Sequence, residues 1–367
     1  MAVTRNFFIP ADGHSLAATL REITDAGGAG VRVELKPQTP FAGDPEFDSS
    51  DLSAWTQANS ANADAINADT KKSHLQIDSN ATSTNWSDAT RSGPFVHQTL
   101  SGDFDVYTRV QLGDIRDNHG VYLLAQSTSD ATDWICVFML VSGGVGVAHT
   151  LLVFRSTVNS ATASQTVVNV SADQYTFAGN VYFRMKRASN DFSTYYSFNG
   201  SSWTQIGATT TRSDFSSDQK LGGAAITANT ANACVVAFDF LRTWPPYVTT
   251  SPVGSVVIDS GVNGTTWDMS TFDALVNMYQ EYNPQSQIGF GTLKFKYGAL
   301  DTNPPSLNGS YLTETQMQAE TDPVGRYFKL EVQYISANGY EQASFNGATI
   351  DASFAMAGAG RGVMRGM

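Results

Sequence analysis

The segment from Asp44 to Trp244 repeats one pattern: short runs of alternating apolar and polar residues, each ended by turn residues. The runs include VYFRMKRAS, FSTYYSF and CVVAFDFLRTW. Alternation places successive side chains on opposite faces of a strand, and turn residues return the chain to a neighbouring strand. A long series of such strands predicts an all-β fold in which two sheets pack as a sandwich or jelly roll.

Two turns can be located within this series. In YYSFNGSSWTQIG, the pair Asn199-Gly200 supplies the residue types that adopt positive φ in a tight hairpin turn. In RSGPFVHQTLSGDFDVYTRVQL, the residues Ser101, Gly102 and Asp103 separate two alternating runs. We therefore predict a hairpin at Asn199-Gly200 and two consecutive strands on either side of Gly102.

Outside this segment the chain divides where its composition changes. Residues 1–43 predict a β-rich arm that is too poor in apolar residues to fold alone, so it should pack against this protein or another subunit. Residues 245–252 begin with a Pro-Pro pair that cannot donate to a sheet, which predicts a linker between residues 44–244 and a smaller β-sandwich at 253–354. Residues 355–367 are rich in Gly, Ala and Met and predict a mobile tail.

Two stretches of the smaller sandwich have a helical pattern. STFDALVNMY places four apolar residues on one face at helical spacing, namely Phe272, Leu275, Val276 and Tyr279. TETQMQAE offers Thr313 with Gln316 as a capping box. Each stretch fits either a single-turn helix or a loop.

Charge and apolar content exclude several classes of partner. The formal net charge is −12, which repels nucleic acid and anionic membrane surfaces. The longest apolar run, Trp134 to Val141, is far shorter than the roughly 20 residues that cross a bilayer. The apolar run Phe7 to Ile9 is too short for the core of a secretory signal, so export by that route is not expected. Cys136 and Cys234 lie in strand-like runs; buried free thiols are favoured over a sheet-to-sheet disulfide.

Four runs together resemble one known domain: FDSSDLSAWTQ, NWSDATRSGPFVHQTLSGDFDVYTRVQL, VYFRMKRASNDFSTYYSFNGSSWTQIG and LGGAAITANTANACVVAFDFLRTW. They resemble the concanavalin A-like lectin/glucanase jelly roll, in the variety appended to bacterial and phage surface proteins and to carbohydrate-active enzymes. The resemblance covers about Phe47 to Trp244, and Arg187 to Trp203 is its most specific part. The C-terminal GRYFKLEVQ and the closing strand look like small β-modules of phage tail and other virion proteins.

The glucanases of this fold carry paired glutamates on an inner strand, because retaining hydrolysis needs two carboxyl groups about 5 Å apart. This chain has no glutamate between Glu46 and Glu281. Asp103 and Asp105 alternate to one face, but they stand beside a turn, which they would cap. The sequence therefore predicts that the protein is not an enzyme, and glycan hydrolysis is the least favoured of three functions.

A sugar site needs an aromatic platform with hydrogen-bonding groups nearby. The candidates for one sheet face are Trp86, Arg91, His97, Tyr122 and Trp134. No cofactor is predicted. The loop GDIRDNHG offers weak Ca²⁺ ligands in Asp114, Asp117 and Asn118, with His119 beside them, but such residues are common in turns because they bond their own backbone. The five histidines have no zinc-ligand spacing.

The resemblances lead to a functional prediction. We expect a non-enzymatic virion structural protein, a capsid decoration, tail or fibre component that lies on the virion surface after release by lysis. Its partners would be other virion proteins and itself, with a trimer favoured among homo-oligomers. Host-surface glycan is the candidate ligand of the jelly roll. The alternative is a carbohydrate-binding adhesin or surface module.

Overall fold

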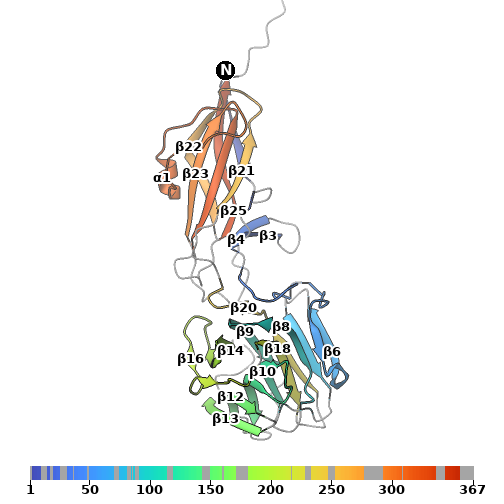
Figure 1. Ribbon diagram of the computed structural model, residues 1–367. Helices are drawn as coiled ribbons and strands as arrows, with labels where there is room; N and C mark the ends of the chain where they lie inside the picture. Colours follow the sequence, from blue (N-terminus) through green and yellow to red (C-terminus); the bar gives the residue numbers. More distant parts are fainter. Residues whose placement is uncertain are drawn as a thin grey trace, which may run out of the picture. The chain divides into compact units, whose positions relative to one another are not determined.

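The computed structural model describes residues 2–9, 15–16, 20–24, 31–35, 37–47, 49–69, 74–80, 84, 86, 91–113, 119–142, 149–158, 161–170, 181–215, 217–227, 233–246, 253–276, 292–307, 309–335 and 344–355. The chain forms two compact units (Figure 1). Unit 1 combines Met1–Pro37 with Tyr247–Met367, and unit 2 is Gln38–Pro246. The second unit is thus inserted into the sequence of the first.

Unit 2 contains two antiparallel sheets, as the alternating runs predict. The seven-stranded sheet has the order β13 (Ala161–Val170), β12 (His149–Val158), β11 (Trp134–Ser142), β10 (His119–Ser127), β18 (Asp218–Thr227), β8 (Phe95–Ser101) and β5 (Thr56–Ala58). The nine-stranded sheet has the order β16 (Thr204–Gln205), β15 (Asp191–Ser197), β14 (Val181–Ala188), β9 (Phe104–Leu112), β19 (Cys234–Phe238), β7 (His74–Ser79) and β6 (Ala63–Asp69), with β17 (Thr210–Thr211) on β15 and β20 (Arg242–Thr243) on β9. A single 3₁₀ turn, Ser60–Asn62, precedes β6.

The core of unit 2 lies between these sheets. On β11, Ile135 and Val137 point into it, while Trp134 and Cys136 belong to a separate apolar cluster on the opposite face. Such alternation shows that the seven-stranded sheet is buried on both faces. Cys136 and Cys234 are both free and buried, and Cys234 lies in the central core, so the thiols are on different layers.

Both predicted turns join strands, with one difference in detail. β8 and β9 flank Gly102, whose φ of 76° requires glycine, but the two strands enter different sheets. β15 and β16 pair as a hairpin around Asn199-Gly200. The connection is longer than a two-residue turn: only Gly200 has positive φ, and the Asn199 carboxamide oxygen accepts bonds from the N–H groups of Ser201 and Ser202.

Unit 1 also contains two sheets. One has the order β1 (Ala2–Ile9), β25 (Ser344–Ala355), β4 (Val31–Leu35) and β3 (Leu20–Thr24), with β22 (Thr266–Val276) also pairing with β25. The other has the order β2 (Ser15–Leu16), β21 (Val253–Asp259), β24 (Tyr327–Ile335) and β23 (Thr292–Leu300). Their apolar faces form a second core around Trp267, Phe295 and Phe328.

The N-terminal residues are part of this sandwich. β1 pairs antiparallel with β25 from Ala2↔Ala355 to Ile9↔Ala348, and the Phe7 ring lies 5.1 Å from that of Trp267. The sequence left open whether residues 1–43 pack against this protein or another subunit; within that segment the described strands β1 and β4 pair with β25 of this protein.

The two helical stretches have different outcomes. The capping box is confirmed: the Gln316 N–H donates to Thr313 Oγ1 at the start of α1 (Glu314–Gln318). The prediction of a helix or a loop at Phe272 to Val276 is wrong, because these residues belong to the strand β22. Tyr279, residues 247–252 of the linker and residues 356–367 of the tail lie outside the described residues. Among the helices of the described part, none has the length and hydropathy to cross a bilayer.

Candidate functional site

The residues predicted to bind sugar converge on the outer face of the seven-stranded sheet. The rings of Trp86 and Trp134 are 6.3 Å apart and edge-on, and Tyr122 stacks on Phe138 at 4.3 Å. Trp86 and Arg91 form an isolated β-bridge beside this cluster. His97 projects from β8 on the same face, 4.6 Å from the Phe95 ring.

This face is closed to solvent. Trp86, His97, Tyr122 and Trp134 are each between 0% and 4% exposed, so their rings offer no open surface to a sugar. Burial, with the nearby charge of Lys220, lowers the pKa of His97 to about 4, and the ring is therefore neutral near pH 7. The four aromatic side chains form a packed layer.

A second aromatic cluster lies on the outer face of the nine-stranded sheet. Tyr107, Tyr182 and Phe240 are buried there, and Trp203 and Trp244 cover them while remaining partly exposed. The two indole rings are 5.2 Å apart, with planes inclined by 71°. Both also meet the Tyr107 ring edge-on, at 5.9 and 5.3 Å. This face therefore presents aromatic surface to solvent.

An arginine stands among these rings. Arg184 on β14 forms a two-pronged ion pair with Asp105 on the neighbouring β9, with both N···O distances 2.7 Å. Its guanidinium lies 5.0 Å from the ring centre of Tyr195, 5.7 Å from that of Trp203 and 5.4 Å from that of Trp244. The two-pronged ion pair holds the guanidinium plane in one orientation, so the position of the guanidinium among the three aromatic rings is well defined.

A network of buried charge continues along the same face. Arg109 Nη2 lies 2.8 Å from Asp239 Oδ2, and His74 Nε2 lies 3.6 Å from the other oxygen of that carboxylate. Arg242 makes a two-pronged pair with Glu46 and lies 4.1 Å above the Phe240 ring. The charges of Arg109, Asp239 and Arg242 all act on the Tyr182 hydroxyl.

Tyr182 is the neutral member of this network. Burial raises the pKa of Tyr182, and the charge of Arg109 partly opposes the shift. The hydroxyl is therefore protonated over the physiological range. It can donate a hydrogen bond but cannot act as an ionised nucleophile.

The aromatic residues that the sequence predicted to bind sugar lie on a buried face of the seven-stranded sheet, whereas the partly exposed aromatic cluster lies on the nine-stranded sheet. In the sequence, Trp203 was used only as part of the hairpin segment and Trp244 only as the end of the jelly-roll segment. A usable signal was present in FDVYTRV: alternation puts Asp105, Tyr107 and Arg109 on one face of β9, which is an unusually polar outer face. The partners Glu46, Arg184 and Asp239 come from segments that are distant in sequence, which no local pattern brings together.

No metal centre accompanies these sites. Among the described residues, no group of three His, Cys, Asp or Glu side chains could hold a metal ion. The weak calcium ligands Asp114, Asp117 and Asn118 lie outside the described residues, and His119 is buried at the start of β10.

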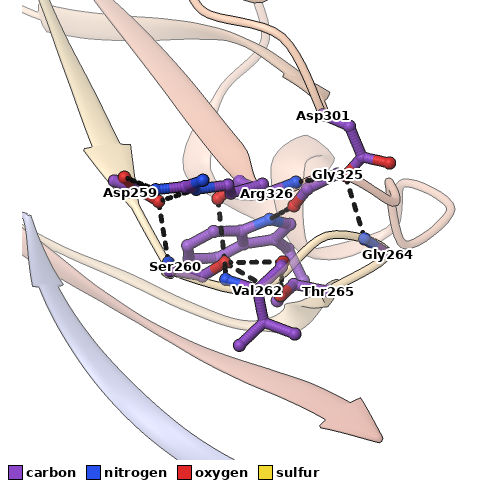
Figure 2. Close-up of polar contacts among 10 residues, drawn as sticks. Asp259, Ser260, Val262, Gly264, Thr265, Asp301, Gly325 and Arg326 are labelled. Carbon is purple, nitrogen blue, oxygen red and sulfur yellow. Dashed lines mark hydrogen bonds and ion pairs between the residues drawn. The ribbon is translucent and has the colours of Figure 1, made fainter. Parts of the chain in front are cut away.

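Unit 1 contains a polar cluster of a different kind, where three loops meet at one end of its sandwich. Figure 2 shows Asp259 and Arg326 facing each other in a two-pronged ion pair, with both N···O distances 2.7 Å. Asp301 Oδ1 accepts from the N–H groups of Gly264 and Arg326, and the Ser260 and Thr265 hydroxyls are 2.8 Å apart. The carboxylates are satisfied by groups of the same cluster, so this arrangement fastens loops rather than binding a ligand.

Comparisons with known proteins complete the description of the site. No protein-family model matches the sequence, and no curated protein matches it. A functionally unknown protein from Saccharomyces cerevisiae has a similar structure, with 16% identity and a TM-score of 0.43 over 53% of this chain and 98% of that chain. A xylan β-1,4-xylosidase from Bacillus halodurans C-125 is 12% identical, with a TM-score of 0.42, over 64% of this chain and 55% of that chain. A β-1,3-glucanase from Mycobacterium marinum is 13% identical, with a TM-score of 0.35, over 56% of this chain and 99% of that chain.

These neighbours require a correction. The prediction of a non-enzymatic virion structural protein, and with it the prediction that the chain is not an enzyme, is contradicted, because two of the named neighbours, the xylosidase and the glucanase, are glycoside hydrolases; both predictions are withdrawn. The phage context has no support, and the virion-surface location loses its basis. The all-β, jelly-roll character of the fold is confirmed. Since every TM-score quoted is below 0.5, the neighbours by themselves assign no activity to this chain.

Proposed function

We propose that the protein acts on glycans and that the outer face of the nine-stranded sheet recognises the sugar chain. The observation that carries the proposal is the partly exposed aromatic site formed by Trp203, Trp244 and Tyr195 around the Asp105–Arg184 fork. Indole rings cover the apolar C–H face of a sugar, and planar ionic groups bond its hydroxyls. The arginine is already neutralised by Asp105, which favours an uncharged polysaccharide.

Binding is tested with the full-length protein by affinity gel electrophoresis. The probes are soluble xylan and β-1,3-glucan, the polymers named for two similar structures, with an α-glucan for comparison. We expect at least one probe to retard the protein. Trp203→Ala should weaken that retardation about tenfold, since an aromatic contact contributes about 1 kcal/mol or more.

Phe198→Ala is the matched control, because Phe198 is an exposed aromatic residue that packs against Tyr196 beyond the site. It should leave binding unchanged. A wild-type protein that none of the polymers retards, or a Trp203→Ala variant that binds as well as wild type, would show that this face does not bind glycan.

Hydrolysis is the second candidate function, because two carboxylates, Glu46 and Asp239, belong to the ion-pair network near Tyr182. Glu46 forms an ion pair with Arg242, whose backbone pairs with Tyr107 on β9. The Asp239 N–H donates to the carbonyl of Arg109, two residues after Tyr107 on the same strand.

Release of reducing ends from the same polymers tests this second function. If the pair is catalytic, Glu46→Gln and Asp239→Asn should each lower the rate at least a hundredfold while polymer binding persists. Thermal unfolding of each variant separates loss of chemistry from loss of fold, because each substitution also removes the partner of an arginine. Turnover that survives both substitutions would exclude this pair.

A further inference from the structure

Four residues form one row across the outer face of the nine-stranded sheet. Asn67 on β6 pairs with Gln76 on β7, which pairs with Ala237 on β19. Ala237 in turn pairs with Gln111 on β9. Residues that pair directly project from the same face of a sheet. The row faces away from the core, because successive residues of a strand alternate between faces and the strand neighbours of all four residues lie in the core of unit 2 or pack against it.

Three members of this row carry carboxamide groups that face solvent. Asn67 is exposed, and Gln76 and Gln111 are partly exposed. Within the described part of the chain, none of these three side chains makes a hydrogen bond, whereas the carboxamides of Gln98 and Gln219 donate to backbone carbonyls. Each carboxamide of the row therefore has an acceptor oxygen and a donor nitrogen available to a ligand.

The chemistry of the row selects the class of its ligand. None of its side chains is ionised, and a carboxamide both donates and accepts hydrogen bonds, as the hydroxyl groups of a sugar also do. A charged group placed on the row would lose water without meeting an opposite charge. The row therefore matches an uncharged chain that is rich in hydroxyl groups, and not an acidic or a basic ligand.

The spacing of the row suits an extended ligand. Neighbouring strands are about 4.8 Å apart, so Asn67 lies one such step from Gln76, and Gln111 lies two steps from Gln76 on its other side, about 10 Å away. Ala237 occupies the position between the two glutamines, and its methyl group extends less far from the sheet than their side chains do. A sugar chain that crosses the strands can therefore meet the three carboxamides in succession, with no large side chain between Gln76 and Gln111.

The row lies on the same face as the aromatic site. The outward-facing residues of β9 are, in order, Asp105, Tyr107, Arg109 and Gln111, and the first two belong to the aromatic site. Gln111 is six residues after Asp105, which is about 20 Å along a strand. One long polysaccharide can therefore contact the aromatic site and the row at the same time.

We propose that Asn67, Gln76 and Gln111 form a second sugar subsite, which binds the same uncharged polysaccharide as the aromatic site. The inference rests on the proposed function, because it extends the bound sugar chain along the same face. A chain that is held at both places binds more tightly than a chain held at one, because the second contact is intramolecular. The carboxamides bind the hydroxyl groups of the sugar, whereas the indole rings cover its apolar face.

Affinity gel electrophoresis of the full-length protein tests the subsite, with xylan, β-1,3-glucan and the α-glucan as probes. The double variant Gln76→Ala, Gln111→Ala removes two hydrogen-bonding side chains and should weaken binding of the retarding polymer about tenfold. Gln57→Ala is the matched control, because Gln57 is an exposed glutamine of β5 in the seven-stranded sheet. It should leave the retardation unchanged.

A blocking variant tests the row without removing a carboxamide. Ala237→Ile places a bulky apolar side chain between Gln76 and Gln111, at a partly exposed strand position that suits a β-branched residue. It should weaken polymer binding about as much as the double variant does. Thermal unfolding of both variants at the wild-type temperature shows that the loss of binding belongs to the surface and not to the fold.

The outcomes separate this inference from the proposed function. If Trp203→Ala weakens binding, but either the double variant or Ala237→Ile binds as wild type does, the row is not a subsite and the aromatic site is unaffected. If the variants of the row weaken binding and Trp203→Ala does not, the row binds sugar and the assignment of the aromatic site is wrong. A wild-type protein that none of the polymers retards would overturn both.

Discussion

At the scale of single residues, His97 shows how burial changes the role that a side chain can take. Its residue type suggested a sugar ligand, but the ring is packed against Phe95 and is 4% exposed. The sequence places His97 on the correct face of the sheet. It could not show that the face is buried, because the exposure of a strand face depends on the tertiary structure.

The same residue makes stability depend on pH. The unfolded chain protonates His97 below its ordinary pKa of 6.5, while the folded ring stays neutral down to about pH 4. The unfolded state therefore binds more protons in this window, and stability falls as pH falls from 6.5 to 4. The full loss is about 3 kcal/mol.

Urea unfolding at pH 7 and near pH 4 measures this loss, and His97→Phe should remove most of it. Carboxylates with lowered pKa values, such as Asp214, lose their contribution only below 3.8, outside this window. An unchanged pH dependence in the variant would assign the effect to other groups.

At the scale of elements, α1 and β22 show which patterns can be interpreted and which cannot. The capping box of α1 is a local hydrogen-bond motif, so Thr313 and Gln316 identify it without knowledge of the fold. β22 was misread because its pairing with β25 shifts register between Asp268 and Asp273. The core residues Trp267, Met269, Phe272 and Ala274 are spaced by two, three and two, so the alternation expected of a strand is interrupted, and Phe272 is shared by this core and the set with helical spacing.

The capping box can be tested directly. Thr313→Ala removes the acceptor for the Gln316 N–H and should lower the stability of unit 1 by about 1 kcal/mol. Thr313→Ser keeps an acceptor and should behave like wild type. Thermal unfolding of the full-length chain measures both, and equal loss in the two variants would show that the threonine methyl group, not the cap, is responsible.

At the scale of the whole molecule, the strands of the jelly roll could be predicted but the assembly of unit 1 could not. Alternation identifies β8 and β9 individually, yet only the structure shows that they enter different sheets. The pairing of β1 with β25 joins residues more than three hundred positions apart. No local propensity carries that information, because β1 acquires its partner only through the fold.

Phe7→Ala tests the contribution of the N-terminal strand. Phe7 is partly buried against Trp267, so the substitution should lower the stability of unit 1 by about 2 kcal/mol. Calorimetry of the full-length chain should show an earlier transition for unit 1 and an unchanged transition for unit 2. Phe198→Ala, in unit 2, is the control, and a Phe7→Ala chain with both transitions unchanged would show that β1 adds little.

The pairing of β1 with β25 also sets the order in which the chain can fold during synthesis. β25 follows β1 by more than three hundred residues, so β1 must wait until those residues have emerged from the ribosome before it can pair with β25. Residues Gln38–Pro246 are complete long before that moment and can fold while translation continues. Until β25 arrives, β1 lacks the strand with which it pairs, and its backbone is exposed to chaperones and to neighbouring nascent chains.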